Sequence, residues 1–190
     1  MSVEFIKDTH TYLVDGIVVP SVSTILRKTI FADKYKNIPE RILKRAAKYG
    51  TEMHEAIEFD DDSKLDKKQK KSFLEWKNLQ KQYNIKPLRQ ETIVHYGIDY
   101  AGTFDMIAVL LGEEALIDIK TTAKLDISYL SWQLSMYAYA YGFDGDLYAV
   151  WLPKREDARV VAIPRIEENQ ILKLLEAYYA LSENGTEIQL

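Results

Sequence analysis

Tyr100-Ala101-Gly102-Thr103-Phe104-Asp105 and Leu116-Ile117-Asp118-Ile119-Lys120-Thr121-Thr122 stand on either side of a short apolar run. The turn between them, Leu111-Gly112-Glu113-Glu114, contains a glycine. Apolar segments that are joined by such a turn predict a β-hairpin. We therefore expect two short strands, Thr103–Leu110 and Ala115–Thr121.

Three charged side chains of this hairpin should lie close together. If the strands pair about the turn, Asp105 lies opposite roughly position 120, and Asp118 shares a face with Lys120 because strand side chains alternate. All three groups are then expected on one side of the sheet. Charges on a largely buried strand need a strong compensating partner. An ion pair between the lysine and the acids is one such partner, and a divalent metal ion is another.

The chain as a whole predicts a mixed sheet flanked by helices, in the α/β (α+β) class. The expected order is helices, three strands, a helix, two strands and a helix, which favours this architecture. At 190 residues, a single domain is expected. Residues 1–38 should form an N-terminal hairpin and helix, residues 39–165 the core, and residues 166–190 a C-terminal helix and tail.

Local signals at the N-terminus predict a hairpin followed by a helix. Asp-Gly within Val14-Asp15-Gly16 favours a tight turn between strands Phe5–Val14 and Ile17–Val19. Ser21 or Ser23 is expected to cap the following helix, because a serine side chain can accept a hydrogen bond from a free backbone N–H.

Further along the chain, Gly50 is expected to separate a helix at Glu40–Tyr49 from one at Glu52–Glu58. The polar tail from Ser182 is expected to fray. The other expected elements are helices at Lys67–Tyr83, Tyr129–Tyr141 and Glu167–Leu181, and strands at Ile93–His95, Leu147–Leu152 and Arg159–Ile163.

Composition narrows the classes of function. The chain is 47% hydrophobic and 12% aromatic, so a globular protein is expected. It has no cysteine, which excludes disulfides, thiolate zinc sites and cysteine-bound iron–sulfur clusters. No apolar run reaches the roughly 18 residues that span a bilayer, and Met1-Ser2-Val3-Glu4 has no signal-peptide pattern. The net charge of −4 argues against nucleic-acid binding through bulk charge but allows a local basic groove.

Four segments resemble, in order and rough spacing, the RecB-like branch of the PD-(D/E)XK nuclease superfamily. They are Gly50-Thr51-Glu52-Met53-His54, Gly102-Thr103-Phe104-Asp105, Asp118-Ile119-Lys120 and Gln133-Leu134-Ser135-Met136-Tyr137. The earlier segment from Val19 to Leu26 is similar to the one that precedes the nuclease core in mitochondrial genome maintenance exonucleases and related phage exonucleases. Two departures are Gly-Thr-Phe-Asp in place of Pro-Asp, and the absence of the cysteines that hold a cluster in some relatives.

The resemblance implies a restriction-endonuclease-like αβββαβ core and a Mg²⁺- or Mn²⁺-dependent deoxyribonuclease. The favoured activity is that of an exonuclease acting on linear DNA with free ends, in recombination, repair or replication. The alternatives are a structure-selective endonuclease, a catalytically inactive DNA-binding module of the same fold, and a protein whose acids only stabilise the sheet. A phage or prokaryotic protein, a cytoplasmic location, no membrane, and a single-strand annealing or single-strand-binding partner are also expected.

The hairpin residues fit phosphodiester hydrolysis. Asp105 and Asp118 are hard oxygen ligands of the kind that Mg²⁺ and Mn²⁺ prefer. Lys120 can hold the attacking water and stabilise the negative charge that develops on the phosphate. The resemblance adds two metal ligands, the Ile119 carbonyl and His54. The ordinary alternative for His54 is a helix histidine that only hydrogen-bonds a neighbour.

Three further polar residues are expected at or near the site. Glu91 is expected just before the strand that enters the hairpin, either as an additional metal ligand or supporting acid, or as an exposed charge. Gln133 and Tyr137 lie four residues apart on one helix face. The resemblance directs this pair at the DNA backbone or the active site, and the alternative is a polar helix edge beside a core tyrosine.

Basic residues indicate where DNA could lie. A helical stripe of cations leads into the segment at Gly50, and such a stripe beside a metal site suits a phosphate backbone. A solvated helix face is the alternative. The run Lys67–Lys71 is instead expected as an exposed helix start. The expected DNA contacts are Arg41, Lys44, Arg45, Lys48, Thr51, Thr121 and Lys154.

Overall fold

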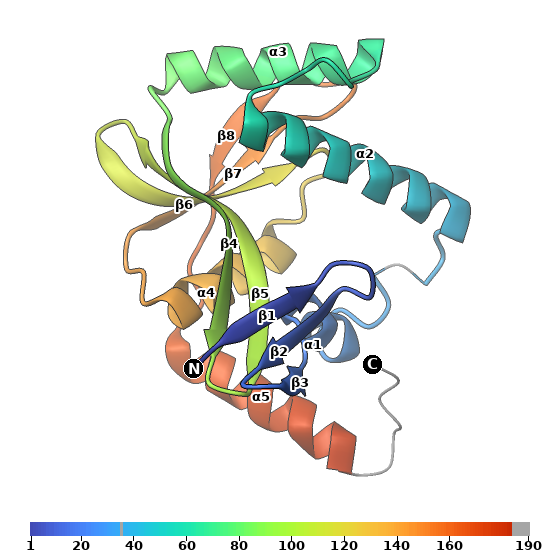
Figure 1. Cartoon of the computed structure of the whole chain (residues 1–190), viewed down its shortest axis with the longest axis vertical. Helices are drawn as coiled ribbons and strands as arrows, with labels where there is room; N and C mark the ends of the chain where they lie inside the picture. The colour runs from blue at the N-terminus through green and yellow to red at the C-terminus, as the bar shows by residue number, and fades with distance from the viewer. Residues whose placement is uncertain (35, 184–190) are drawn as a thin grey trace.

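The computed structural model describes residues 1–34 and 36–183, which form two sheets and five helices (Figure 1). The strands are β1 (Val3–Ile6), β2 (Thr11–Val14), β3 (Ile17–Val19), β4 (Lys86–Tyr96), β5 (Tyr100–Leu110), β6 (Glu113–Lys120), β7 (Asp146–Trp151) and β8 (Arg159–Ala162). The helices are α1 (Val22–Lys28), α2 (Glu40–Phe59), α3 (Lys67–Gln82), α4 (Ile127–Tyr141) and α5 (Glu168–Glu183).

Five strands form the central sheet in the order β4-β5-β6-β7-β8. Strands β6 and β7 are parallel, whereas the other neighbours are antiparallel. Parallel neighbours need a crossover connection, which α4 provides (Figure 1). The prediction of a mixed sheet flanked by helices is therefore confirmed.

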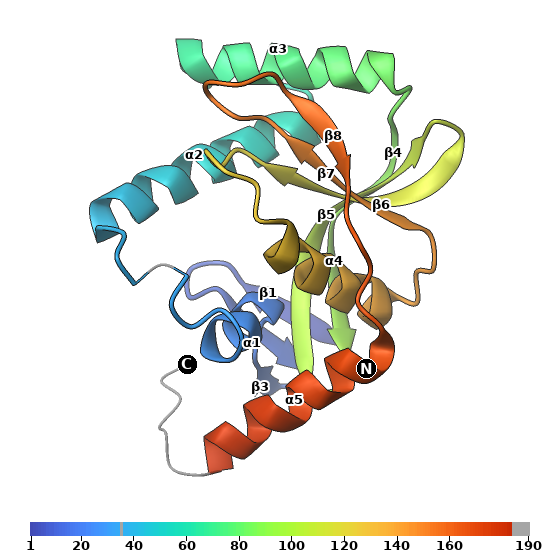
Figure 2. The same cartoon turned by 180° about the vertical axis from the view of Figure 1, so that it is seen from behind.

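Helices cover both faces of this sheet, and β6 shows how the faces divide. Its residues Ala115, Ile117 and Ile119 belong to the core formed with α2 and α3. Leu116 belongs to the opposite core, which is formed with α1, α4 and α5 (Figure 2). Because side chains alternate along a strand, Asp118 and Lys120 belong to the α4 face.

The N-terminal sheet β1-β2-β3 packs against the start of β5 through Ala101. Ser21 caps α1 by accepting a hydrogen bond from the Thr24 N–H at 3.1 Å, as predicted. The single strand expected over Phe5–Val14 is wrong. Residues 7–10 form a turn that ends at His10 with a positive φ of 52°, so β1 and β2 pair as a hairpin of their own.

Helix α2 runs without interruption, so the expected break at Gly50 is also wrong. An isolated glycine costs a helix interior only about 1 kcal/mol relative to alanine. Tyr49, Met53 and Ile57 recur every four residues and are buried in the core with α3 and the sheet. Burial of this apolar stripe outweighs the cost of one glycine.

The hairpin of β5 and β6 has a tighter turn than expected. Leu110 pairs with Glu113 and Met106 with Ile117, so the connection is Leu111-Gly112 alone. Both residues have positive φ, 54° and 103°, as in the two-residue turns that match strand twist. Continuing this register brings Asp105 beside position 118, so the expected position 120 is wrong by two residues.

The chain termini add two findings. Helix α5 includes Ser182 and ends at Glu183, and the remainder of the tail that was expected to fray, residues 184–190, lies outside the described residues. Within residues 1–34 and 36–183, no helix combines the length and apolar character needed to cross a membrane.

A close approach between α4 and β5 depends on Gly102. A Cβ atom at this position would lie 2.5 Å from Cε1 of Tyr137. Because the ring would have to move within a packed core, we expect Gly102→Ala to lower the free energy of unfolding by about 1–3 kcal/mol, as urea denaturation would measure.

Gly50→Ala is the matched control. A Cβ atom there would meet Thr121 Oγ1 at an ordinary 3.8 Å, and alanine favours a helix, so a gain of about 0.5–1 kcal/mol is expected. Equal stability of the Gly102→Ala variant and the wild type would mean that the Tyr137 ring moves without cost.

Candidate functional site

The candidate site is built around the backbone of Ile119, at the point where β5 and β6 stop pairing. The last pair of that ladder is Met106 with Ile117. Beyond it, the Ile119 N–H donates to Asp105 Oδ2 at 2.6 Å, and His54 Nε2 donates to the Ile119 carbonyl at 3.0 Å. Backbone groups inside a protein must find partners, and here two side chains take the place of the missing strand.

A group of three possible metal ligands surrounds this point: His54, Glu91 and Asp105. His54 Nδ1 lies 3.4 Å from Asp105 Oδ1 and 3.7 Å from Glu91 Oε1. The ladder pairs Gln90 with Met106 and Thr92 with Phe104 on either side, so the two acids are cross-strand neighbours. Like charges opposite one another destabilise a sheet, and the imidazole offsets that repulsion.

Glu91 does not lie before the strand, as was expected, but inside β4, which begins at Lys86 rather than near Ile93. Its φ of 42° is left-handed, which is uncommon for a residue other than glycine. Such strained positions are typical of functional sites. The conformation accompanies a side chain that is about one-third exposed and directed at His54.

The electrostatics of this group favour a charged imidazole in the metal-free protein. Burial acts to lower the pKa of His54, but the Asp105 and Glu91 carboxylates outweigh it and raise this pKa well above its ordinary value. Burial acts in the opposite sense on Asp105, and the imidazolium together with Lys120 lowers the pKa of that carboxyl. The protonated His54 ring and the carboxylates of Asp105 and Glu91 therefore stabilise one another.

Asp118 and Lys120 form an ion pair on the α4 face, which agrees with the predicted shared face. Lys120 Nζ donates to Asp118 Oδ1 at 2.8 Å and contacts Oδ2 at 2.6 Å without hydrogen-bond geometry. Burial raises the pKa of Asp118 to about 6, with a further contribution from the Asp105 carboxylate. Burial acts to lower the pKa of Lys120, but Asp118 raises it above the ordinary value. The lysine is therefore held as a cation.

Gln133 and Tyr137 reach toward the site from α4. Gln133 Nε2 donates to the Tyr137 hydroxyl at 3.2 Å, whereas the buried Oε1 has no hydrogen-bond partner among the described residues. Whichever way the amide is turned, one of its two polar atoms stays unsatisfied, and an unsatisfied buried group is costly. Burial raises the pKa of Tyr137 well above its ordinary value, so the hydroxyl keeps its proton.

The donor set suits a divalent cation. Atoms of His54, Glu91 and Asp105 lie within 4.8 Å of one another, close enough to share an ion. Mg²⁺ and Mn²⁺ prefer oxygen ligands, and an imidazole among them suits Mn²⁺ better than Mg²⁺. Asp118 is not among these three residues, and both of its oxygens contact Lys120. Its predicted role as a metal ligand stays a prediction.

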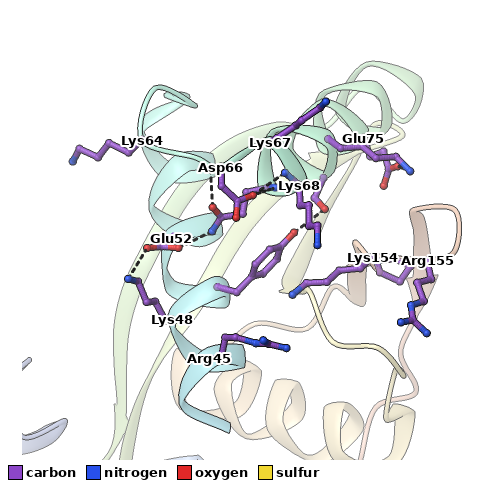
Figure 3. Close-up of a pocket in the computed structure, with 15 residues that line it drawn as sticks. Arg45, Lys48, Glu52, Lys64, Asp66, Lys67, Lys68, Glu75, Lys154 and Arg155 are labelled. Carbon is purple, nitrogen blue, oxygen red and sulfur yellow. Dashed lines mark hydrogen bonds and ion pairs between the residues drawn. The ribbon is translucent and has the colours of Figure 1, made fainter. Parts of the chain in front are cut away.

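The expected DNA contacts divide into two sets. Arg45, Lys48 and Lys154 line a groove of about 1210 Å³ between α2, the start of α3 and the loop after β7 (Figure 3). The other expected contacts lie outside its lining. Arg41 and Lys44 are exposed near the start of α2, Thr51 is exposed further along it, and Thr121 is half-buried just after β6.

Further lysines line the groove. Lys67, Lys68 and Lys71, which we expected as an exposed helix start rather than as DNA contacts, are exposed and belong to its lining. Tyr49 also lines it, and Lys154 Nζ lies 3.6 Å from the centre of its ring. The lysine run itself is visible in the sequence, but its position opposite Lys154 depends on tertiary structure.

Comparison with known proteins supports the fold. No protein-family model and no curated protein matches the chain. Among solved structures, that of SSO0001 is similar, with a TM-score of 0.53 and 17% sequence identity over 87% of this chain and 76% of that chain. A likeness at this level of identity shows the arrangement of helices and strands, and function must be argued from the site.

The His54 cluster makes a prediction for stability against pH. Because the folded-state pKa of His54 is raised, its ion pairing stabilises the metal-free protein fully below the unfolded pKa of about 6.5, and this contribution is lost as the pH rises through the folded pKa. The excess unfolding free energy of wild type over His54→Gln, measured in EDTA by urea denaturation, should therefore shrink as the pH rises above about 6.5.

His95→Gln is the control for loss of an imidazole outside the metal-ligand group, because the His95 ring contacts the Gly97 carbonyl at 3.0 Å. The pH-dependent difference from the wild type should be larger for His54→Gln than for His95→Gln. A constant difference between wild type and His54→Gln would show that the imidazole gains no proton from its acidic neighbours.

Proposed function

We propose that this protein is a metal-dependent deoxyribonuclease with a restriction-endonuclease-like αβββαβ core. The observation that carries the proposal is the arrangement at Ile119, where His54, Glu91 and Asp105 gather beside the Asp118–Lys120 pair. The proposed core would consist of the preceding helices, β4 to β6, the α4 crossover and β7. The four segments that resemble RecB-like nucleases lie on these elements and include His54, Asp105, Asp118 and Lys120.

The residues divide the chemistry of phosphodiester hydrolysis between them. His54, Glu91 and Asp105 would hold Mg²⁺ or Mn²⁺, and the carbonyl of Ile119 lies beside them. When bound, such an ion lowers the pKa of a coordinated water and neutralises phosphate oxygens. His54 must give up a proton to serve as a ligand, so metal affinity should rise with pH.

Lys120 supplies the second function. Its side chain is about one-quarter exposed while that of Asp118 is almost fully buried, so the cation can face substrate and the carboxylate holds it in place. A preorganised cation next to the phosphate stabilises the charge that develops in the transition state. Asp118 is thereby proposed as the residue that orients Lys120, and it lies close enough to Asp105 to influence the same ion.

The favoured reaction is hydrolysis from free DNA ends. This assignment comes from the resemblance to phage and mitochondrial maintenance exonucleases. It also agrees with the sequence, in which no separate base-reading motif is visible, since sequence-specific cleavage needs side chains directed at base edges. A structure-selective endonuclease would use the same residues, and an inactive DNA-binding module would share only the fold.

Replacing Lys120 or Asp118 tests the proposed chemistry. We expect Lys120→Met and Asp118→Asn each to reduce cleavage of labelled DNA in Mn²⁺ by at least about a hundred-fold, because each removes or misplaces the charge that acts in the transition state. Circular dichroism should remain that of a folded protein. Glu113→Gln and Lys124→Met, which alter exposed charges near β6, should cleave like the wild type. Full activity in both site variants would remove the proposed active site.

The form of the DNA tests the exonuclease assignment. A linear duplex and a linear single strand are each prepared with the label at the 5′ end or at the 3′ end, and one of the two labels should be released as mononucleotides or short oligonucleotides from the earliest times. Covalently closed circles of the same sequence should survive, because they offer no terminus. Rapid conversion of closed circles to linear DNA would replace the exonuclease assignment with the endonuclease alternative.

A further inference from the structure

The groove in Figure 3 concentrates positive charge on a protein that is negative as a whole. Eight of its lining side chains are lysine or arginine and three are acidic, a net charge of +5, whereas the chain carries −4. The cations come from four separate segments: α2, the loop between α2 and α3, the first turns of α3 and the loop after β7. They therefore line an elongated anion better than they would enclose a single phosphate.

Much of this positive charge is not neutralised by the protein. Within the described residues, no ion pair is formed by Arg45, Lys67, Lys68 or Arg155, although acidic residues lie in the same lining. The carboxylate of Glu52 is engaged by Gln69 Nε2 at 2.7 Å, and that of Asp66 accepts the first backbone N–H groups of α3. Three of the eight cations do have carboxylate partners: Lys48 pairs with Glu52 at 3.8 Å, Lys71 with Glu75 at 3.6 Å and Lys64 with Glu55 at 3.2 Å. The acids of the lining thus engage the scaffold and two of the cations, and most of the positive charge stays without an ion pair among the described residues.

The surroundings of Lys154 show how closely the positive charges lie. Its ammonium group lies over the Tyr49 ring rather than against a carboxylate. Burial lowers the pKa of Lys154 and Arg45 lowers it further; Asp66 acts in the opposite sense and Lys68 adds a smaller lowering. An anion in the groove would relieve this repulsion.

The lysines at the start of α3 are unfavourable for the helix dipole. The N-terminus of a helix carries partial positive charge, so cations in the first turn are unfavourable by a few tenths to about 1 kcal/mol each. Lys67 and Lys68 occupy that turn, which contains no acidic residue. Helix stability alone would favour acids at these positions, so the lysines oppose the fold locally.

The groove adjoins the candidate active site through β7. Trp151 pairs with Lys120 in the parallel ladder, and the next residue, Leu152, donates its N–H to the Lys120 carbonyl at 2.7 Å. Pro153 and Lys154 follow immediately and line the groove. On the opposite wall, α2 contributes Lys48 to the groove and His54 to the metal-ligand group.

We propose that this groove is a second substrate-binding site, which holds the phosphodiester backbone of a nucleic-acid strand away from the phosphate that is cleaved. The choice of nucleic acid as the ligand rests on the proposed nuclease function. Recognition is by charge, without reading of bases, because Lys154 covers the face of Tyr49 that a base could otherwise stack on. Binding is therefore indifferent to sequence and strongly dependent on salt.

The test measures binding without cleavage. Fluorescence anisotropy of labelled oligonucleotides, single-stranded and double-stranded with the same sequence, is recorded in EDTA over a range of salt concentrations. The groove variant is Lys67→Gln/Lys68→Gln. The control is Lys81→Gln/Lys86→Gln, which changes the net charge equally at exposed lysines outside the groove lining.

For a single strand, each lost phosphate contact should reduce the slope of log K against log [salt] by about 0.7, so the groove variant should lose about 1.4 and the control nothing. The thermal midpoint of the groove variant should equal or exceed that of the wild type, because cations leave a helix N-terminus. The strand form that shows the larger change in slope is the form that occupies the groove.

Equal slopes for wild type and groove variant, or equal losses in the groove variant and the control, would overturn the proposal. The nuclease assignment is judged separately, by cleavage in Mn²⁺. A wild-type protein that does not cleave but shows the difference in slope would support the groove and refute the nuclease. A protein that cleaves DNA but shows no difference in slope would support the nuclease and refute the groove as a binding site.

Discussion

The site depends on how the backbone of Ile119 is satisfied. Strand β6 pairs with β7 as far as Lys120, but its pairing with β5 ends at Ile117, which is opposite Met106. The N–H and carbonyl that face the departing strand would each cost free energy if left without a partner in the interior. Asp105 and His54 fill that role, and in doing so bring a carboxylate and an imidazole to the edge of the sheet. Glu91 joins them from β4, so a gap in hydrogen bonding between strands becomes a place where ligands for a cation gather.

The same place concentrates features that work against stability. Glu91 is strained and stands across from a second acid, Asp118 is buried with a pKa raised to about 6, and one polar atom of Gln133 is unsatisfied. By contrast, the capping box in which Asp66 and Gln69 begin α3 follows the local preferences of a helix start. Natural proteins usually break such local rules at functional sites. The clustering of exceptions around Ile119 therefore supports a functional role for this region independently of any resemblance.

The sequence predicted some of these features and missed others for identifiable reasons. The Asp118–Lys120 pair followed from strand alternation, which depends on local geometry alone. The register of Asp105 was missed because Leu111 adopts a left-handed conformation that its residue type does not signal. The break expected at Gly50 was wrong because tertiary burial of neighbouring apolar residues overrode a local preference. The contribution of Lys67, Lys68 and Lys71 to the groove was missed because these residues approach Lys154 only when α3 and the loop after β7 come together.

The unbroken course of α2 has a consequence for how substrate would be measured. One rigid helix carries Arg45 in the groove and His54 in the metal-ligand group, and the two positions are nine residues apart along the chain. At a rise of 1.5 Å per residue, their separation along the helix axis is fixed at about 13 Å. A strand that is held by its backbone near Arg45 and cut near His54 would therefore be cut at a fixed distance from the point where it is held. The helix is continuous through Gly50, so this distance does not change.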